Sequence, residues 1–426
     1  RCWGYNYYGQ LGRGSKYDTI GDAAGEVASL TDVDLGAGRT VVQLAVGRYH
    51  NCALLDNGQL KCWGLNEDIG VGGGQLGLGD MQNRGAGTND MGANLPNVDL
   101  GSGWTIVEIA AGGYHTCARL ENGAERALKC WGRNDRGQLG LGDTNNRGDE
   151  DGEMGDSLPA VQLGTGRSAV ALSLHILHSC ALLDDASVKF WGFNGYGALG
   201  LGDNINRGDG VGDSPQGNGA GGMGDSLPAV DLGPGQTAVQ LASGVYNTCA
   251  LLDDGRLCCW GDNDRGQLGL NDTNSRGDED GEMGDRLPAV QLGTGRSAVA
   301  LALGWAHSCA LLDDASVKCW GANYGRLGLG DTLSRGDGEG AMGDSLPSVP
   351  LCLGPFSPCA VPACTVSSVH AGYLHTCALS SLGGVRCWGY SGYGQLGRGS
   401  HYDTIGDAAG EVASLADVDL GAGRTV

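Results

Sequence analysis

The residues with the clearest chemistry in this sequence are cysteines, and most of them occur in pairs at a fixed spacing. Each pair brackets a short turn such as Asp56-Asn57-Gly58, a three-residue hairpin loop with glycine at its left-handed position. Such a hairpin places the two cysteines opposite each other, about 4.5–5.5 Å apart, which is within disulfide range. We therefore predict five disulfides: Cys52–Cys62, Cys117–Cys130 (across a longer loop), Cys249–Cys259, Cys309–Cys319 and Cys377–Cys387.

The remaining cysteines depart from this pattern, and they do not make a zinc site, which would need CxxC knuckles or clustered histidines. Cys180 stands opposite Phe190 in its hairpin, so it is predicted to be a buried free thiol. Cys258, one position before a paired cysteine, is predicted to point to the opposite face of its sheet. The pairing of the others stays open: Cys2, Cys352, Cys359 and Cys364. This use of 16 cysteines is typical of an oxidising compartment, which predicts a secreted or cell-surface protein.

Histidines form the second recurring group, each two residues before a repeat cysteine. They are His50, His115, His178, His307 and His375, with Asn247 at the same place in the remaining repeat. An active site needs one constellation of different groups, so a histidine in nearly every repeat is better explained as structural. We expect these side chains to bond to a neighbouring turn, as asparagine also can. With no GxSxG, P-loop or dinucleotide fingerprint present, we predict no enzyme, no catalytic residue and no organic cofactor.

Acidic, glycine-rich stretches such as GDTNNRGDEDGEMGD offer the oxygen ligands that calcium prefers. The candidate ligands are Asp143, Asp149 and Asp156, and the alternative is that Arg147 pairs with Asp149 or Asp156. RGD occurs in four of these stretches, always in the same repeat slot. A loop that needs a cation, a flexible turn and a carboxylate explains RGD as well as receptor recognition does.

These motifs are positioned by a repeat of 60 to 69 residues. Its apolar runs, such as VVQLAVG and NCALL, have strand length and are bounded by turn residues, while no window shows a helical period. We assign a single domain over residues 1–426, with a partial repeat at 1–41 and full repeats at about 42–105, 106–169, 170–237, 238–297, 298–366 and 367–426. Many short sheets at even spacing indicate a β-propeller.

The repeat GxxHxCALxxxGxxxCWGxNxxGQLGxGD, followed by LPxVDLG, resembles that of the regulator of chromosome condensation (RCC1-like) family over essentially the whole chain. The resemblance implies an all-β propeller of about seven four-stranded blades, six from full repeats and one from the partial repeat. The variety with paired cysteines is similar to RCC1-type repeats of secreted bacterial and algal proteins.

The first and last residues of the chain are nearly the same sequence. Residues 1–41 and 386–426 differ at four positions, and the interval between them holds six repeats. Either the two ends close a ring imperfectly, with Cys2 lacking its HxCAL partner, or the chain is one turn of a longer array. Because other repeats have diverged widely, we favour the second interpretation, a segment of a longer repetitive protein.

Composition narrows the possible partners. A net charge of −22 disfavours nucleic acid, and no apolar run is long enough to span a membrane. The glycosylation sequon at Asn271 suits a secreted surface loop. We expect a non-catalytic extracellular scaffold that binds proteins or glycans, or itself in an array, through the inserts at residues 203–222 and 351–366. The alternative is a guanine-nucleotide exchange factor or regulatory propeller for a small GTPase.

Overall fold

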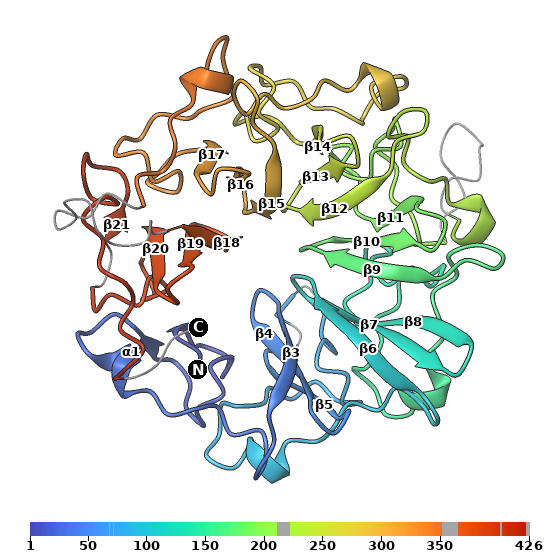
Figure 1. The fold of residues 1–426 in the computed structure, drawn as a ribbon. Coiled ribbons are helices and arrows are strands. Elements are labelled where there is room, and N and C mark those ends of the chain that lie inside the picture. The colour runs from blue at the N-terminus through green and yellow to red at the C-terminus, as the bar shows by residue number, and fades with distance from the viewer. Residues whose placement is uncertain (68, 71, 211–221, 352–364, 401–402, 423–426) are drawn as a thin grey trace.

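The protein is a ring of small antiparallel sheets around a central axis (Figure 1). The computed structural model describes residues 1–67, 69–70, 72–210, 222–351, 365–400 and 403–422. Six positions of the ring hold a complete blade, and the seventh holds part of one. The predicted all-β propeller of about seven blades is therefore confirmed.

Each complete blade contains three regular strands in chain order. The blades are β3 (Val41–Val46), β4 (His50–Leu55) and β5 (Leu60–Gly64); β6 (Thr105–Ala111), β7 (His115–Asn122) and β8 (Glu125–Gly132); β9 (Ala169–Leu174), β10 (His178–Leu183) and β11 (Val188–Gly192); β12 (Ala238–Ser243), β13 (Asn247–Leu252) and β14 (Leu257–Gly261); β15 (Ala298–Leu303), β16 (His307–Leu312) and β17 (Val317–Gly321); and β18 (Val366–Ala371), β19 (His375–Ser380) and β20 (Val385–Tyr390). The partial blade contains β1 (Gly4–Tyr5) and β2 (Thr19–Ile20).

The predicted fourth strand of each blade is short. In the last complete blade it is β21 (Thr404–Ile405), which pairs with β20. In the other complete blades it is a single bridge from the glycine of WG to an arginine, such as Gly64 to Arg84. Helices among the described residues are equally short, namely α1 (Glu26–Ser29) and the 3-10 turns η1 (Gly92–Asn94), η2 (Gly155–Ser157), η3 (Gly224–Ser226), η4 (Gly284–Arg286) and η5 (Gly343–Ser345).

The five predicted disulfides are all present, and each joins residues that face each other across a hairpin. Cys52 pairs with Cys62 in the register of β4 and β5, for example, and the Cα atoms of every bridged pair lie 4.1 Å apart. Cys180 stands opposite Phe190, as the sequence predicts, and it is buried and free. The bridges pack against the tryptophan of the next blade, so they form part of the contact between blades.

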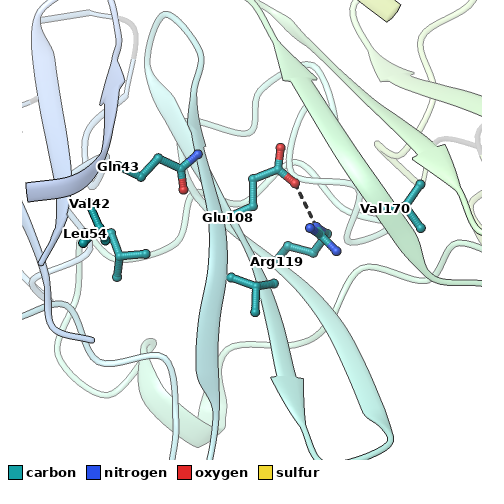
Figure 2. Close-up of a pocket in the computed structure, with 7 residues that line it drawn as sticks. Val42, Gln43, Leu54, Glu108, Arg119 and Val170 are labelled. Carbon is teal, nitrogen blue, oxygen red and sulfur yellow. Dashed lines mark hydrogen bonds and ion pairs between the residues drawn. The ribbon is translucent and has the colours of Figure 1, made fainter. Parts of the chain in front are cut away.

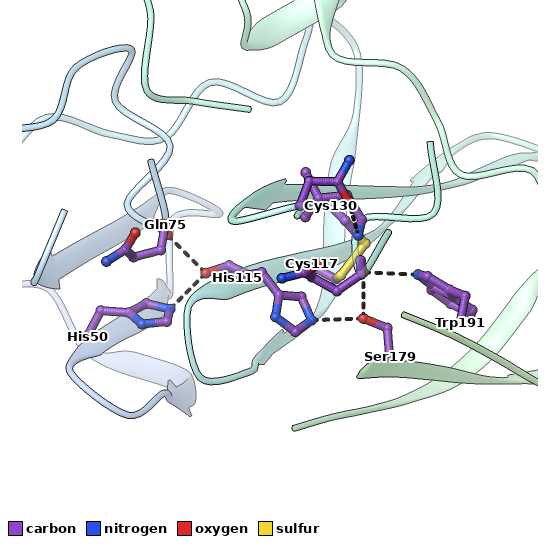
Figure 3. The surroundings of a disulfide bond; sticks show 11 residues. His50, Gln75, His115, Cys117, Cys130, Ser179 and Trp191 are labelled. Carbon is purple, nitrogen blue, oxygen red and sulfur yellow. Dashed lines mark hydrogen bonds between the residues drawn. A yellow bond between two sulfur atoms is a disulfide. The ribbon is translucent and has the colours of Figure 1, made fainter. Parts of the chain in front are cut away.

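Hydrogen bonds repeat at every junction between blades (Figure 3). The carbonyl oxygen of Gln138, in a GQLG turn, accepts from Trp191 Nε1 at 3.0 Å and from Ser179 Oγ at 2.8 Å, both in the next blade. Ser179 and Trp191 can reach the same oxygen because they face each other in the register of β10 and β11. The hydroxyl that donates to Gln138 in turn accepts from His115 Nε2 at 2.8 Å. The same bond joins His50 to Thr116 and His307 to Thr376, whereas His178 has no hydrogen-bond partner among the described residues. His50, His115 and His307 therefore link blades, and their partner is a strand hydroxyl rather than the neighbouring turn that we expected.

The glycine of the GxxH motif is required by this arrangement. A Cβ atom on Gly112 would lie 2.2 Å from Cε1 of His115, so a larger residue would push the imidazole away from Ser179.

The partial blade closes the ring through the same kind of contacts. Trp3 Nε1 donates to the carbonyl oxygen of Gln395 at 3.1 Å, which is the bond that every other WG tryptophan makes to its preceding blade. Arg1 Nη1 donates to the carbonyl oxygen of Leu420 at 2.9 Å, so residues near the two ends of the chain lie side by side, as Figure 1 also shows. On the other side of the partial blade, the carbonyl oxygen of Gln10 accepts a hydrogen bond from Trp63 Nε1 at 3.0 Å.

Candidate interaction surface

Two sets of loops, the GxxH turns and the loops that follow WG, lie at one end of the ring. His50 begins β4 and faces Gly64 at the end of β5, so the GxxH turn and the loop after WG meet at the same end. The hairpin turns between paired cysteines lie at the opposite end. We call the first the aromatic end, because every tyrosine that the structure describes makes an aromatic or cation–π contact there.

Tyrosines connect the blades of the aromatic end without interruption across the junction of the chain ends. The ring centroids of Tyr5 and Tyr393 lie 4.8 Å apart, those of Tyr5 and Tyr49 6.0 Å, and those of Tyr49 and Tyr114 6.1 Å. Burial and the neighbouring phenols raise the pKa of Tyr5 to about 12. The tyrosine cluster is therefore uncharged at physiological pH and offers ring faces and hydroxyl groups to a partner.

Arginines extend this cluster from the first complete blade to the last one. The Arg48 guanidinium lies 5.1 Å from the ring centroid of Tyr49 and 5.0 Å from that of Tyr373, which comes from the last complete blade. Tyr373 stacks on Trp305 at 5.6 Å. Each contact is within the range at which a cation or a second ring is attracted to an aromatic face.

Arg326 ends the network on the far side. Its guanidinium lies 5.4 Å from Trp305 and 5.0 Å from Tyr324, and its Nε and Nη1 are buried without a hydrogen-bond partner. Burial lowers the pKa of Arg326. A buried cation between two rings costs stability unless something compensates for it, so the position points to a use beyond folding.

The network leaves a large amount of aromatic surface exposed. The exposed rings are Tyr7, Tyr17, Tyr196, Trp305, Tyr324, Tyr373 and Tyr393, with 37 to 61% of their surface accessible. Tyrosine, tryptophan and arginine are the residues enriched at the centres of protein interfaces. The composition and exposure of the aromatic end therefore match those of a binding surface.

A second feature of the described residues is a cavity between the first three complete blades. A cavity of about 490 Å³ is lined by Val42, Gln43, Leu54, Val107, Glu108, Arg119 and Val170 (Figure 2). Glu108 pairs with Arg119 at 2.8 Å and accepts from the backbone of Leu172 at 3.2 Å. Gln43 bonds to both backbone groups of Ile109. The polar side chains of this cavity thus tie neighbouring blades together.

The repeated histidines are neutral in the folded protein. Burial lowers the pKa of His50 and His178 to about 4, and that of His115 and His307 to about 3. Such groups cannot exchange protons near neutral pH. The bonds of His50, His115 and His307 to the next blade give these three a structural role. The side chain of Asn247 at the same position has no hydrogen-bond partner in the described part of the chain.

The calcium candidates do not form one site, which corrects our expectation for the acidic stretch. Asp143 accepts from Arg147 at 2.6 Å, Asp156 accepts from the backbone and hydroxyl of Ser102, and burial together with Glu153 raises the pKa of Asp149. Among the described residues no group of three or more acidic, histidine or cysteine side chains could hold a metal ion. The carboxylates of the acidic stretch thus make separate contacts within their loops.

The arginine of each RGD is also occupied within the protein. Arg147 pairs with Asp143, four residues earlier, and not with Asp149 or Asp156 as we had considered. The same pairing joins Arg207 to Asp203, Arg276 to Asp272 and Arg335 to Asp331. It also joins Arg84 to Asp80, in a repeat that has no RGD sequence. The exposure of these arginine side chains is only 5 to 18%, so RGD serves the fold of the loop.

Other predicted site residues have local structural explanations. Asn271 adopts a left-handed conformation with φ of 62° at a place where other repeats have glycine, and its Oδ1 accepts from the backbone of Met342. Its glycosylation stays a prediction. Cys258 is free and buried opposite Ala250. It occupies the repeat position of Lys61, whose Nζ donates to the carbonyl oxygen of Gly92. Cys352, Cys359, Cys364 and most of the two inserts lie outside the described residues.

Together, the ring of blades and the aromatic end define a repeat β-propeller with an exposed aromatic surface. The family model of the RCC1-like domain matches residues 2–425. The chain therefore belongs to the RCC1-like family, in a variety whose blades carry disulfide pairs.

Relatives within the family have diverse roles. The chain is 29% identical over 370 residues to the ultraviolet-B receptor UVR8 of Arabidopsis thaliana, a match that covers 86% of this chain and 68% of that protein. It is 27% identical over 431 residues to the secretion-regulating guanine nucleotide exchange factor of Bos taurus, covering 94% and 76%.

Solved structures agree on the fold. Human WBSCR16 superposes with a TM-score of 0.67 at 20% identity and covers 94% of this chain and 91% of its own. Yeast RCC1 (Prp20), solved bound to Kap60, superposes with a TM-score of 0.61 at 21% identity, covering 96% and 82%. At these identities the likeness establishes the propeller and nothing finer.

Proposed function

We propose that this protein is a non-catalytic, extracellular interaction propeller that binds a protein partner through its aromatic end. The observation that carries the proposal is the continuous network of tyrosine, tryptophan and arginine described above. Soluble proteins rarely expose so many contiguous rings without a partner that covers them. The rigid blades hold the rings in place before binding, which lowers the entropy lost on association.

The disulfides support an extracellular location. Five bridges, four with a sequence separation of 10 residues and one of 13, are typical of proteins that fold in an oxidising environment. The described residues contain no helix long and apolar enough to cross a membrane. Under this proposal the protein reaches its partner outside the cell or at its surface.

The second candidate function is regulation of a small GTPase by nucleotide exchange. It is favoured by the likeness to the secretion-regulating exchange factor, which spans 94% of this chain. An exchange factor meets its GTPase in the reducing cytosol, where paired cysteines stay reduced. The redox state of the cysteines in cells therefore separates the two functions.

The first test traps thiols in intact cells with an alkylating reagent and maps the modified cysteines by mass spectrometry. The extracellular function requires the ten paired cysteines to escape modification until the sample is denatured and reduced. Modification of these cysteines in cells, together with faster release of labelled GDP from small GTPases, would favour the exchange factor.

The second test asks which end of the ring binds. Photo-crosslinking residues replace Tyr324 at the aromatic end or Leu382 in a hairpin turn at the opposite end, where 61% of the leucine is exposed. Crosslinks to a protein in the native extracellular fraction are expected from position 324, and substitution of Tyr393 by serine should weaken capture at least tenfold. Equal crosslinking from both positions, or capture of glycan alone, would contradict the proposal.

A further inference from the structure

Arg326 differs from the residue that most other repeats carry at its position. The GQLG turn has glutamine there in five places, among them Gln138 and Gln267. The backbone carbonyl at this position holds the next blade, and that of Arg326 accepts from Trp388 Nε1 at 2.8 Å and from Thr376 Oγ1 at 3.3 Å. The backbone role is thus kept at Arg326, and only the side chain is different.

The glutamine side chain stabilises its own loop, and arginine cannot replace it. Gln138 Oε1 accepts from the backbone N–H of Arg136 at 2.8 Å, and Gln267 Oε1 makes the same bond in its repeat at 2.9 Å. A guanidinium group contains no acceptor, so Arg326 cannot make this bond. In addition, Nε and Nη1 of Arg326 are buried without a hydrogen-bond partner among the described residues. The arginine therefore costs the fold stability in two ways.

No carboxylate of the described residues compensates for the charge of Arg326. Other arginines of the ring, such as Arg147 and Arg119, pair with a carboxylate at 2.6 and 2.8 Å. Arg326 forms no such ion pair within the described part of the chain, and its neighbours are the rings of Trp305 and Tyr324. In a chain with 49 acidic and 27 basic residues, this guanidinium is left for a carboxylate from elsewhere.

Arg48 is a second arginine of the aromatic end that has no ion pair to a described residue. Its guanidinium lies over the rings of Tyr49 and Tyr373 instead. Tyr373 stacks on Trp305, and Arg326 lies over Trp305. A stacked pair of rings therefore connects the two guanidinium groups, and a ligand that neutralises both must carry two negative groups.

We propose that Arg326 and Arg48 form a recognition site for two acidic side chains, aspartate or glutamate, in one segment of a protein partner. The proposal rests on the proposed function, because it gives the chemical class of the partner that binds the aromatic end. Each guanidinium donates to a carboxylate in a charge-assisted pair, and the adjacent rings pack against the methylene stem of the acidic residue. The partner thus supplies the acceptors that the buried guanidinium lacks.

The surroundings of Arg326 favour acidic side chains over other sources of carboxylate. Only 5% of Arg326 is exposed, while the rings that cover it, Trp305 and Tyr324, are 37 and 58% exposed, so the guanidinium lies one side chain below the surface. An exposed side chain such as Tyr324 changes rotamer rapidly and can turn aside. A carboxylate on a slender stem can then enter, whereas the carboxylate of a uronic acid is fixed to a sugar ring. A carboxyl terminus offers one charge for two arginines.

Labelled peptides with both ends capped test the chemistry of the site. Each probe carries two glutamates separated by a glycine spacer of varied length, and its counterpart carries glutamines. Fluorescence anisotropy should show that the best glutamate peptide binds at least about tenfold more tightly than its glutamine counterpart, and that added salt weakens it. Equal binding of the two, no binding of either, or tighter binding of polygalacturonate or of an uncapped peptide without glutamate would overturn the proposal.

Arg326→Gln is the decisive variant, because it restores the residue of five other repeats. It should keep or raise the Tm, since it removes a buried charge and recovers the loop bond, yet it should weaken the glutamate peptide at least about tenfold. The control is Arg265→Gln, which changes an exposed arginine of the same end and should alter neither quantity. An unchanged affinity or a lower Tm in Arg326→Gln would overturn the proposal.

Arg48→Gln tests the second half of the site. It should weaken the peptide with two glutamates to the affinity of a peptide with one, because only one carboxylate then finds a guanidinium. Equal affinity of the wild-type protein for both peptides would overturn the paired site.

Photo-crosslinking separates this proposal from the proposed function. The crosslinking residue is placed at Tyr196, which is 42% exposed, so that Tyr324 stays in place beside Arg326. Capture of a protein by the wild-type ring that is lost in Arg326→Gln is the expected result. Equal capture by both would overturn the carboxylate site and leave the proposed function standing.

Discussion

At the scale of single residues, small substitutions at repeat positions show what each position does. Phe190 replaces a bridged cysteine, Cys258 replaces a lysine that ties a loop, and Asn247 replaces a linking histidine. Each exception leaves the blade intact, since the other contacts of its junction persist. The junctions are therefore redundant, and single losses should be measurable without unfolding the ring.

The buried histidines should make the protein sensitive to acid. Their folded pKa values of about 3 to 4 lie below the value of 6.5 for an unfolded histidine. The unfolded state thus binds more protons as the pH falls below 6.5, and the free energy of unfolding decreases by up to about 1.4 kcal/mol per pH unit for each histidine. This stability is complete above pH 6.5 and is lost between there and about pH 4. Urea denaturation between pH 7 and 4.5 measures the slope.

His115→Asn is the matched variant, because asparagine already occupies this position in another blade. The variant should be less stable at pH 7, because it loses the bond to Ser179. Its free energy of unfolding should decrease less steeply with falling pH, by about the contribution of one histidine. Identical slopes in both proteins would show that His115 does not remain neutral in the fold.

At the scale of elements, the hairpin of β10 and β11 keeps the geometry of a bridged hairpin without the bridge. Cys180 faces Phe190 in the register that joins Cys52 to Cys62, and Phe190 contacts Trp260 edge-on at 5.8 Å between ring centroids. The phenyl ring of Phe190 fills the place of the missing disulfide and packs against the next blade.

Phe190→Cys should therefore create a sixth disulfide without other changes. Loss of the phenyl ring lowers stability by about 3–5 kcal/mol, and the bridge returns roughly 2–3 kcal/mol by restricting the unfolded chain. The control is Phe190→Ala, which loses the ring and cannot form the bridge. Guanidinium denaturation with and without reductant measures the loss from the missing phenyl ring and the gain from the bridge. Equal stability of the oxidised variant and the alanine control would refute the prediction.

At the scale of the whole molecule, the ring consists of five junctions between complete blades and two junctions beside the partial blade. Trp191 is fully buried at an ordinary junction, whereas Trp3 is partly exposed at the junction that joins the chain ends. The two tryptophans make the same hydrogen bond, so the difference between them reports on packing alone.

Trp191→Ala should lower the free energy of unfolding by about 3–5 kcal/mol, while Trp3→Ala should cost roughly half as much. Urea denaturation of both variants, followed by circular dichroism, makes the comparison. A loss from Trp3→Ala as large as that from Trp191→Ala would mean that the partial blade is packed as tightly as the others.

The repeat period and hairpin spacing were enough to predict the blades, the register and the five bridges, because they depend on contacts that recur. The aromatic end could not be predicted in this way. Tyr49 and Tyr393 occupy different positions of their repeats, and both contact Tyr5 of the partial blade only because the ring closes. The calcium candidates failed for a related reason: a run of carboxylates does not show that Asp143 is already engaged by Arg147.

The contact between each bridge and the next blade's tryptophan has an optical consequence. An excited indole transfers an electron readily to a neighbouring disulfide, so Trp131, Trp191 and Trp320 should emit weakly while the bridges are intact. Trp260 lies instead against Cys180 and Phe190, and it should stay bright. Reduction of the bridges should therefore raise the fluorescence of the folded protein, without any added label.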